Sequence, residues 1–277
     1  MPAISRLLIV MLTAAALASC SVSTPAKPPM WRVSDGDTTV YLLGSMHLLP
    51  SGTDWRDEAV NAAIADADTL VLESDPQAKT DFAAVARAPG LKPLAERLGP
   101  DKQNALMKAI ARTGQPESAF DDYKDWAAAV MLGTGDALEA GATAKRGVDA
   151  VLWTDFKRRK RTTIALEQPG AQLQALDILP PELQHLMLED AITGPGYDST
   201  LGAWSDGDVA ALDKATGPKT LRAFLVLAPN KRWSGWIAKR MAQPGKLLVA
   251  VGAGHLVGEQ SIVEMLTAKG FKVERVQ

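Results

Sequence analysis

Two stretches, Thr39–His47 (TVYLLGSMH) and Lys246–His255 (KLLVAVGAGH), decide the fold of this chain. Each begins with a short apolar run and ends in a Gly-x-x-His turn. Short apolar runs bounded by glycine predict buried strands, and a helical pattern follows each turn. Helices between strands indicate an α/β core. We therefore expect both turns to lie just past a strand, at the rim of a sheet, where α/β folds bind ligands.

The rest of the chain continues this alternation of strands and helices. Around Asp35-Gly36-Asp37, the β-rich runs Trp31–Ser34 and Thr39–Leu43 predict a hairpin. A helix is expected from Thr53 or Asp54 to about Ala67. Further strands are expected at 69–73, 162–167 and 271–276, and helices within 81–141 and at 147–160, 180–192, 206–215, 221–227, 230–241 and 259–269.

Two of the three histidines, His47 and His255, have a glycine three residues earlier and follow a hydrophobic run. Gly44 and Gly252 allow the backbone to turn sharply or to approach a ligand closely. A neutral imidazole can bind a metal through one nitrogen while a neighbouring acceptor orients the other. The two turns can meet in space although they lie at opposite ends of the domain, so they predict one shared site.

Glu73 and Glu167 each end a predicted strand. Carboxylates serve as metal ligands or as general bases for a bound water. Two histidines with one or two glutamates suit Zn²⁺, Mn²⁺, Co²⁺ or another first-row divalent ion with an open position for water, which the metal would activate. The alternative interpretation is that strand-end histidines make structural hydrogen bonds and that the acids are solvated.

Other chemistry is less well supported by the sequence. His185 lies in a helical pattern without a partner motif, which indicates a surface or packing residue. Ser45 has no GxSxG setting, which argues against a serine hydrolase. The net charge of −2 and the 47% hydrophobic content are those of an ordinary globular protein. The basic run Lys157–Arg161 is interpreted as a solvated helix end, and no nucleic-acid partner is expected.

The N-terminus has the features of a bacterial lipoprotein. Residues 1–19 combine Arg6 with the apolar run Leu7–Ala18 and predict a signal peptide. They end before Cys20, the single cysteine, in a lipobox-like Leu-Ala-Ser-Cys. We expect lipidation of Cys20, a tether over 20–29, and a domain over 30–277, held at the membrane and facing the periplasm. The residue directly after Cys20 is not an aspartate, which favours the outer membrane over retention in the inner membrane. The alternatives are a plain signal peptide with a chance cysteine and an uncleaved anchor.

Five motifs together resemble the TraB/GumN family, which also includes the animal Tiki proteins. In chain order they are VYLLGSMHLLP, LVLESD, GVDAVLW, IALEQPGAQLQALD and LLVAVGAGHLVG. The resemblance implies an α/β fold of the erythromycin-esterase/ChaN type, with a central mixed sheet flanked by many helices. It also implies a metal-dependent hydrolase, with peptidase activity in the Tiki branch. Its site residues map onto His47, His255, Glu73 and Glu167, with Gln172 and Asp149 in supporting positions.

One position departs from this family pattern. The family often has an Arg-Asn pair before a late tryptophan, whereas here Pro229 stands at the arginine position before Asn230. Arg232 is the nearby candidate to replace that arginine. Three functions are therefore weighed: a metal-dependent hydrolase acting on a peptide or small molecule, with His47, His255 and Glu73 as ligands and Glu73 and Glu167 as catalytic acids; a non-catalytic metal- or haem-binding lipoprotein; and an inactive scaffold.

Overall fold

A six-stranded mixed sheet forms the centre of the protein, as a computed structural model describes it over residues 23–277. The strand order is β6-β5-β7-β3-β2-β8, in which β3, β7, β5 and β6 run parallel while β2 pairs antiparallel with β3 and with β8. The strands span β2 Met30–Ser34, β3 Thr38–Ser45, β5 Thr69–Leu72, β6 Thr162–Ala165, β7 Gly245–Gly252 and β8 Val273–Arg275. The α/β class and the mixed sheet are as expected from the sequence.

The hairpin predicted around Asp35-Gly36-Asp37 is the β2–β3 pair, with Ser34 opposite Thr39 next to the turn. The Asp35 carboxylate closes the turn by accepting hydrogen bonds from the main-chain N–H groups of Asp37 and Thr38, at 3.2 and 2.9 Å. A short aspartate side chain that bonds to nearby backbone in this way is a common turn device. The central strands β3, β5 and β7 are apolar because both faces of the sheet are covered.

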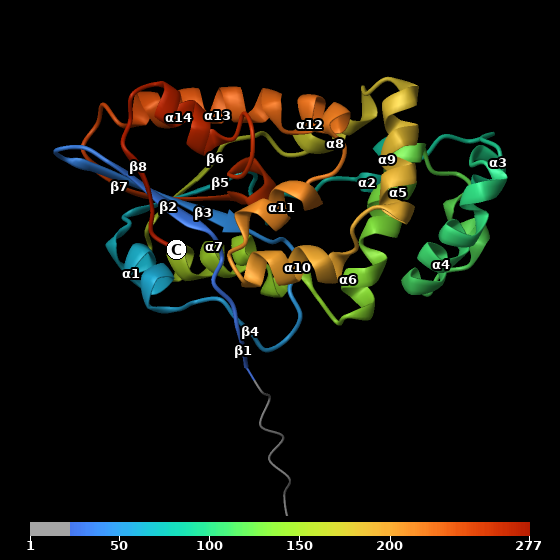
Figure 1. Cartoon of the computed structure of the whole chain (residues 1–277), viewed down its shortest axis with the longest axis horizontal. Helices are drawn as coiled ribbons and strands as arrows, with labels where there is room; N and C mark the ends of the chain where they lie inside the picture. Colours follow the sequence, from blue (N-terminus) through green and yellow to red (C-terminus); the bar gives the residue numbers. More distant parts are fainter. Residues whose placement is uncertain (1–22) are drawn as a thin grey trace, which may run out of the picture.

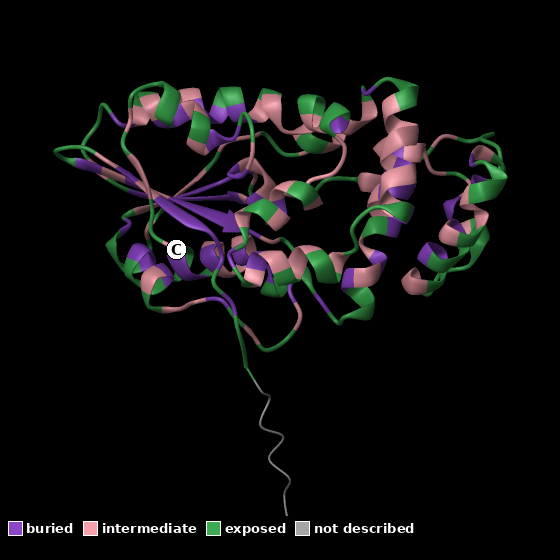
Figure 2. Cartoon of the chain, in the orientation of Figure 1, coloured by how far each residue is buried: buried purple, intermediate pink, exposed green. Residues whose placement is uncertain are grey.

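Helices cover both faces of the sheet, which gives three layers (Figure 1). Helices α1 and α7 pack on one face, and α13 with α14 lies over the other. Figure 2 shows that buried residues concentrate on the central strands and on the helix sides turned toward them. The chain-order bounds of the helices that flank the sheet are α1 Glu58–Asp66, α7 Val148–Arg158, α8 Ala171–Asp177, α10 Tyr197–Ser205, α11 Val209–Ala215, α12 Lys219–Leu225, α13 Leu227–Arg240 and α14 Ile262–Ala268.

A helical extension lies beside the sheet and has its own apolar core (Figure 1). Most of it comes from the connection between β5 and β6, and α9 joins it from the connection between β6 and β7 by packing along α5. Its helices are α2 Phe82–Ala86, α3 Leu94–Arg97, α4 Gln103–Thr113, α5 Asp125–Gly133, α6 Gly135–Glu139 and α9 Pro181–Thr193. The main helical segments expected from the sequence are thus present.

The start of the first helix differs from the sequence-based expectation. The first helix does not begin at Thr53 or Asp54 but at Glu58, because the Asp57 side chain caps it by accepting from the Val60 N–H at 3.0 Å. Thr53 and Asp54 instead form the short strand β4 Thr53–Asp54, which pairs in parallel with β1 Thr24–Pro25.

The segment expected to be a tether is partly packed on the domain. Besides the pairing of β1, Ala26, Pro28 and Pro29 are buried. The packed chain therefore begins before Met30, since these apolar residues cover the edge of the main core. Cys20 and the signal peptide expected over 1–19 lie outside the described residues. Within residues 23–277, no helix has the length and apolar character that a membrane span requires.

Candidate functional site

The strand register brings the two Gly-x-x-His turns to the same edge of the sheet. Ser45 at the end of β3 lies opposite Gly252 at the end of β7, and the two strands are parallel. Strand β5 flanks β7 on its other side and ends directly before Glu73. His47 and His255 therefore leave the same edge at which Glu73 stands, although the two turns come from opposite ends of the described chain.

Both glycines of these turns are closely packed. A Cβ added at Gly44 would lie 3.1 Å from the Ala253 Cβ and 3.1 Å from the Pro29 Cγ. A Cβ added at Gly252 would lie 3.3 Å from Glu73 Oε1. The second glycine thus lets the backbone come within hydrogen-bonding range of the carboxylate.

The Glu73 carboxylate is the centre of the site and is only 5% exposed. Its Oε2 accepts from Gln172 Nε2 at 2.7 Å, and its Oε1 accepts from the Gly252 N–H at 2.6 Å. The Nε2 atoms of His47 and His255 lie 3.9 Å from Oε2 and 3.7 Å from Oε1. A buried carboxylate is stable only when it is hydrogen-bonded and its charge is compensated, so the two imidazoles face a fixed negative charge.

The His255 ring is fixed by Asn230, which is fully buried on α13. Asn230 Nδ2 donates to the carbonyl oxygens of His255 and Gln260 at 3.3 and 2.9 Å, so Oδ1 is the atom that faces His255 Nδ1, at 2.8 Å. Nδ1 must then carry the proton, and Nε2 presents a lone pair toward Glu73. Burial lowers the pKa of His255 and favours this neutral form. Trp233 packs against the ring with a centroid separation of 4.6 Å.

His47 has a different environment, because its side chain is 61% exposed and pairs with an acid. Its Nδ1 lies 2.8 Å from Asp149 Oδ2, near the start of α7. This hydrogen bond, with added attraction from Asp149 and Glu73, raises the pKa of His47 to about 9. The N-terminus of α7 lies directly against the turn, since a Cβ added at Gly147 would be 2.1 Å from the His47 carbonyl oxygen.

Glu167 lies beside this cluster rather than within it. Its main-chain N–H donates to the Glu73 carbonyl oxygen at 2.8 Å, which places the two strand ends next to each other. Its carboxylate is 7% exposed and pairs with Arg232 Nη2 at 2.7 Å. No hydrogen bond or ion pair within residues 23–277 joins this carboxylate to Glu73 or to the two histidines. Arg232, the candidate to replace the family arginine, thus contacts the predicted catalytic acid.

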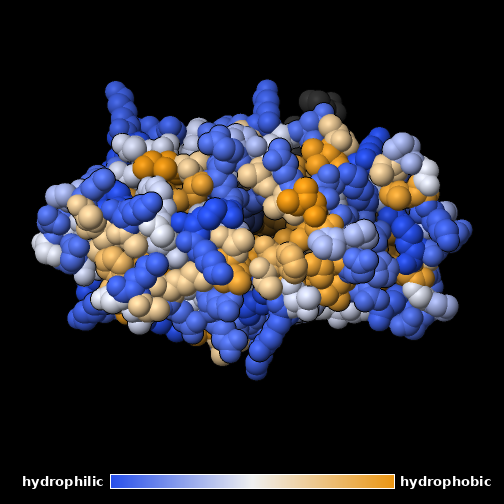
Figure 3. Space-filling model, turned by 90° about the horizontal axis from the view of Figure 1, so that it is seen from above, coloured by the Kyte–Doolittle hydropathy of each residue, from blue (hydrophilic) through white to orange (hydrophobic). Residues whose placement is uncertain are grey.

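Two cavities flank the cluster, and Gln172 lines both. On the His47 side, a cavity of about 340 Å³ is lined by seven polar or charged residues, among them Asp149 and Lys145, and by three small apolar ones. On the His255 side, a cavity of about 580 Å³ has a largely apolar lining contributed by α8, α12 and α13. Figure 3 shows hydrophobic side chains gathered around a hollow on the face that carries α12 and α13.

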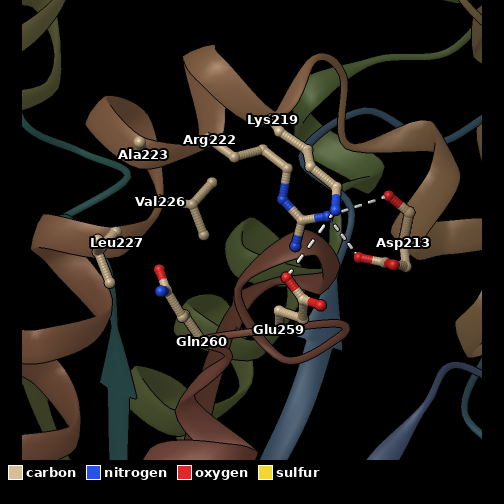
Figure 4. Close-up of a pocket in the computed structure, with 8 residues that line it drawn as sticks. All are labelled: Asp213, Lys219, Arg222, Ala223, Val226, Leu227, Glu259 and Gln260. Carbon is tan, nitrogen blue, oxygen red and sulfur yellow. Dashed lines mark hydrogen bonds and ion pairs between the residues drawn. The ribbon is translucent and has the colours of Figure 1, made fainter.

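A third cavity, of about 250 Å³, lies near the loop that follows His255 (Figure 4). Its two cations are matched by two acids, Arg222 by Asp213 and Lys219 by Glu259. Arg222 also donates to the Val257 carbonyl oxygen at 3.3 Å, so it supports the loop. This balance of charge gives the cavity no net attraction for an anion.

The side chains around Glu73 are of the types that bind a divalent metal, but their ligand atoms lie slightly too far apart. Two imidazole nitrogens and a carboxylate oxygen are common ligands of first-row metals, and each imidazole has an acceptor on its other nitrogen. Ligand atoms on a tetrahedral Zn²⁺ lie about 3.4 Å apart, slightly closer than the 3.7 and 3.9 Å found here. Within the described chain, no group of three or more His, Cys, Asp or Glu side chains is arranged as it stands to hold a metal ion.

The structure therefore brings together most of the side chains singled out in the sequence. His47, His255 and Glu73 face one another, and Asp149 and Gln172 support them. His185 is elsewhere, on α9, where it pairs with Asp125 at 3.0 Å. Sequence reasoning gave no role to three residues of the site: Asn230, which orients His255, Gly147, which lets α7 approach His47, and Trp233, which packs on His255. The signals in the sequence were the family motifs that contain them, since Gly147 begins GVDAVLW and Asn230 precedes the late tryptophan.

Fold and site together define a class: α/β proteins with a buried carboxylate between two imidazoles at the carboxyl edge of parallel strands. The sequence pattern of the TraB/PrgY/gumN family matches residues 29–275. The chain therefore belongs to the TraB/PrgY/gumN family.

Two curated relatives are similar over most of their length. The "Uncharacterized protein YbaP" of Escherichia coli (strain K12) is 27% identical over 238 residues, which are 83% of this chain and 89% of that protein. The protein of the same name from Shigella flexneri gives the same identity and coverage. No solved structure matches the chain.

Proposed function

We propose that this protein is a divalent-metal-dependent hydrolase, with His47, His255 and Glu73 as the metal ligands. One observation carries the proposal: the two imidazole Nε2 atoms approach the same buried carboxylate at 3.9 and 3.7 Å. The His255 lone pair faces a carboxylate oxygen, an arrangement that is repulsive unless a cation lies between them. A metal ion with this donor set would supply an activated water and polarise the bond to be cut.

The surrounding residues have roles that suit this chemistry. Gln172 and the Gly252 N–H hold the Glu73 carboxylate in place, while Asn230 and Asp149 orient the two imidazoles. Because the pKa of His47 is raised to about 9, that ring is protonated at neutral pH when no metal is bound. The metal-free site thus holds a positive charge beside Glu73, which a divalent cation would replace.

Glu167 is the proposed general base. Its carboxylate is nearly buried, is held by Arg232, and lines the apolar cavity together with His255. A carboxylate in this position can accept a proton from a water that attacks a substrate in the cavity. Glu73 itself has two of its lone pairs occupied by hydrogen bonds, which suits a ligand and a positioning group.

The test is the metal content of the purified protein after reconstitution with Zn²⁺, Mn²⁺ or Co²⁺. We expect near-stoichiometric metal in the wild type and loss of that metal in the double variant His47→Ala/His255→Ala. His185→Ala is the matched control, because this third histidine pairs with Asp125 away from the site. Absence of metal from the wild type after reconstitution, or equal metal in the double variant, would refute the proposal.

A non-catalytic metal- or haem-binding protein is the alternative function, supported by the apolar cavity beside His255. A carrier would bind metal or haem without needing Glu167. Haem binding would give a Soret band on addition of haem. Hydrolysis of a peptide or ester, lost in Glu167→Gln with metal content unchanged, would favour the enzyme over the carrier.

We also propose that lipidation of Cys20 holds this domain at the periplasmic face of a membrane, with the outer membrane favoured. The lipobox-like sequence that ends at Cys20 supports the proposal. Mass spectrometry of the N-terminal peptide from the native host would show a diacylated or triacylated cysteine. An unmodified Cys20 in a secreted chain would exclude the anchor.

A further inference from the structure

The cavity between α8, α12 and α13 is the largest near the site, at about 580 Å³. This volume is within the range typical of small-molecule sites. Eleven of the fifteen residues that line it are apolar, among them Leu176, Ile178, Leu179, Phe224 and Trp233. Two of these large side chains remain uncovered, since Ile178 is 82% exposed and Phe224 is 50% exposed. Exposed apolar residues that gather at a concave surface indicate a binding site.

The polar residues that line this cavity lie within or directly beside the cluster around Glu73. Gln172, which donates to Glu73, lines the cavity together with His255 and Glu167. Arg232 also lines it, and its charge is matched by Glu167 at 2.7 Å. The cavity therefore has no unpaired charge among these residues to attract an ion. An occupant would lie against Gln172 and His255, the two lining side chains that face the Glu73 carboxylate.

The cavity on the opposite side of Gln172, next to His47, is lined by more polar and charged residues. Its lining includes Ser74, Gln77, Lys145 and Asp149, which are polar or charged. A substrate that extends across Glu73 would thus have an apolar group on the His255 side and a polar portion on the His47 side. The two linings define the direction in which such a molecule lies.

We infer that the α8–α12–α13 cavity binds a bulky, uncharged apolar group that flanks the amide or ester bond to be hydrolysed. A phenylalanine-sized group would fit there, and its burial would remove a large apolar area from water. That the neighbouring amide or ester bond is hydrolysed rests on the proposed function. The binding of the apolar group in the cavity does not depend on it. An alanine-sized group would leave the cavity mostly unfilled and would bind roughly tenfold or more weakly.

The experiment measures binding without turnover, on metal-free protein. The probes are N-acetyl-phenylalaninamide and N-acetyl-alaninamide, compared by ligand-observed NMR titration. Ala228→Phe and Ala175→Phe are the test variants, because both alanines are exposed, line the cavity and can accept a larger side chain without disturbing a core. Ala111→Phe is the matched control, an exposed alanine on α4 in the helical extension.

We expect the phenylalanine probe to bind roughly tenfold or more tightly than the alanine probe, and each cavity-filling variant to remove that preference. The control variant should keep it. Equal binding of the two probes, or an unchanged preference in both cavity variants, would overturn the inference.

The outcome is separable from that of the proposed function. If the protein prefers the phenylalanine probe but takes up no metal, the hydrolase proposal is refuted and the inference about the cavity is supported. If the protein takes up stoichiometric metal but binds both probes equally, the inference about the cavity is refuted and the metal site is supported. If the metal-loaded protein hydrolyses these compounds, N-acetyl-phenylalaninamide and N-acetyl-phenylalanine methyl ester show whether it cleaves the amide or the ester bond. Faster cleavage of either compound than of its alanine analogue supports the inference.

Discussion

Replacing Asn230 with alanine is expected to destabilise the protein and to release the His255 ring. The fully buried Asn230 side chain makes three hydrogen bonds, one with His255 Nδ1 and two with the carbonyl oxygens of His255 and Gln260. At a net contribution of about 1 kcal/mol for each bond, the variant should lose about 3 kcal/mol of unfolding free energy. For a domain of this size, that corresponds to a fall of about 6–12 °C in Tm.

The assay has two parts, because a loss of stability alone would not identify the tautomer. Thermal and denaturant unfolding give the free energy, and ¹⁵N NMR of the His255 imidazole reports which ring nitrogen carries the proton. Wild type should show the Nδ1–H form, since Asn230 Oδ1 can only accept. The variant should show a mixture of the two tautomers.

Asn61→Ala is the matched control, because this asparagine is exposed and its side chain bonds only to Arg56 among residues 23–277. Its unfolding free energy should change by no more than about 0.5 kcal/mol. The reasoning would be refuted if Asn230→Ala melted like the control. It would also be refuted if wild-type His255 carried its proton on Nε2.

Three further predictions concern the same edge of the sheet. Gly147→Ala should cost about 1–3 kcal/mol of unfolding free energy by denaturant titration, because its Cβ would overlap the His47 carbonyl oxygen, whereas Gly202→Ala, with no atom within 4 Å, should cost nothing. Gly252→Ala should weaken metal binding roughly tenfold in a competition titration, since its Cβ would press on Glu73 Oε1, and an affinity like that of Gly36→Ala would contradict this. In metal-free protein, the stabilisation from protonated His47 is complete below pH 6.5 and is lost as the pH rises through about 9, so Tm should fall over that interval. The fall should be smaller in Asp149→Asn, and an equal fall in both proteins would exclude His47 as its source.

The parts of this protein that follow from local sequence were predictable. The apolar runs before His47 and His255 are strands, and Glu73 stands directly after a strand, so the sequence alone was enough to expect these three side chains at one edge. Their convergence depends only on parallel pairing of adjacent strands. The family resemblance added Gln172 and Asp149, which local patterns alone do not indicate.

The remaining features depend on contacts between distant segments. Asn230 lies on a helix whose periodicity predicts packing, and nothing local shows that its amide reaches His255 and Gln260. The close approach of Gly147 to His47 likewise joins residues that no periodicity connects. The helix predicted from Thr53 failed for a related reason, because Thr53 pairs with Thr24 instead of entering the helix.

The hydrogen bond between the end of β7 and the residue after β5 also has a consequence for how the protein folds. The bond from the Gly252 N–H to Glu73 joins positions 179 residues apart, so closing it is entropically expensive and such contacts form slowly. During synthesis, the ribosome must release the chain beyond His255 before this edge of the sheet can close. A chain that ends before Gly252 therefore lacks the Glu73 site altogether, and any activity at Glu73 requires synthesis to pass His255.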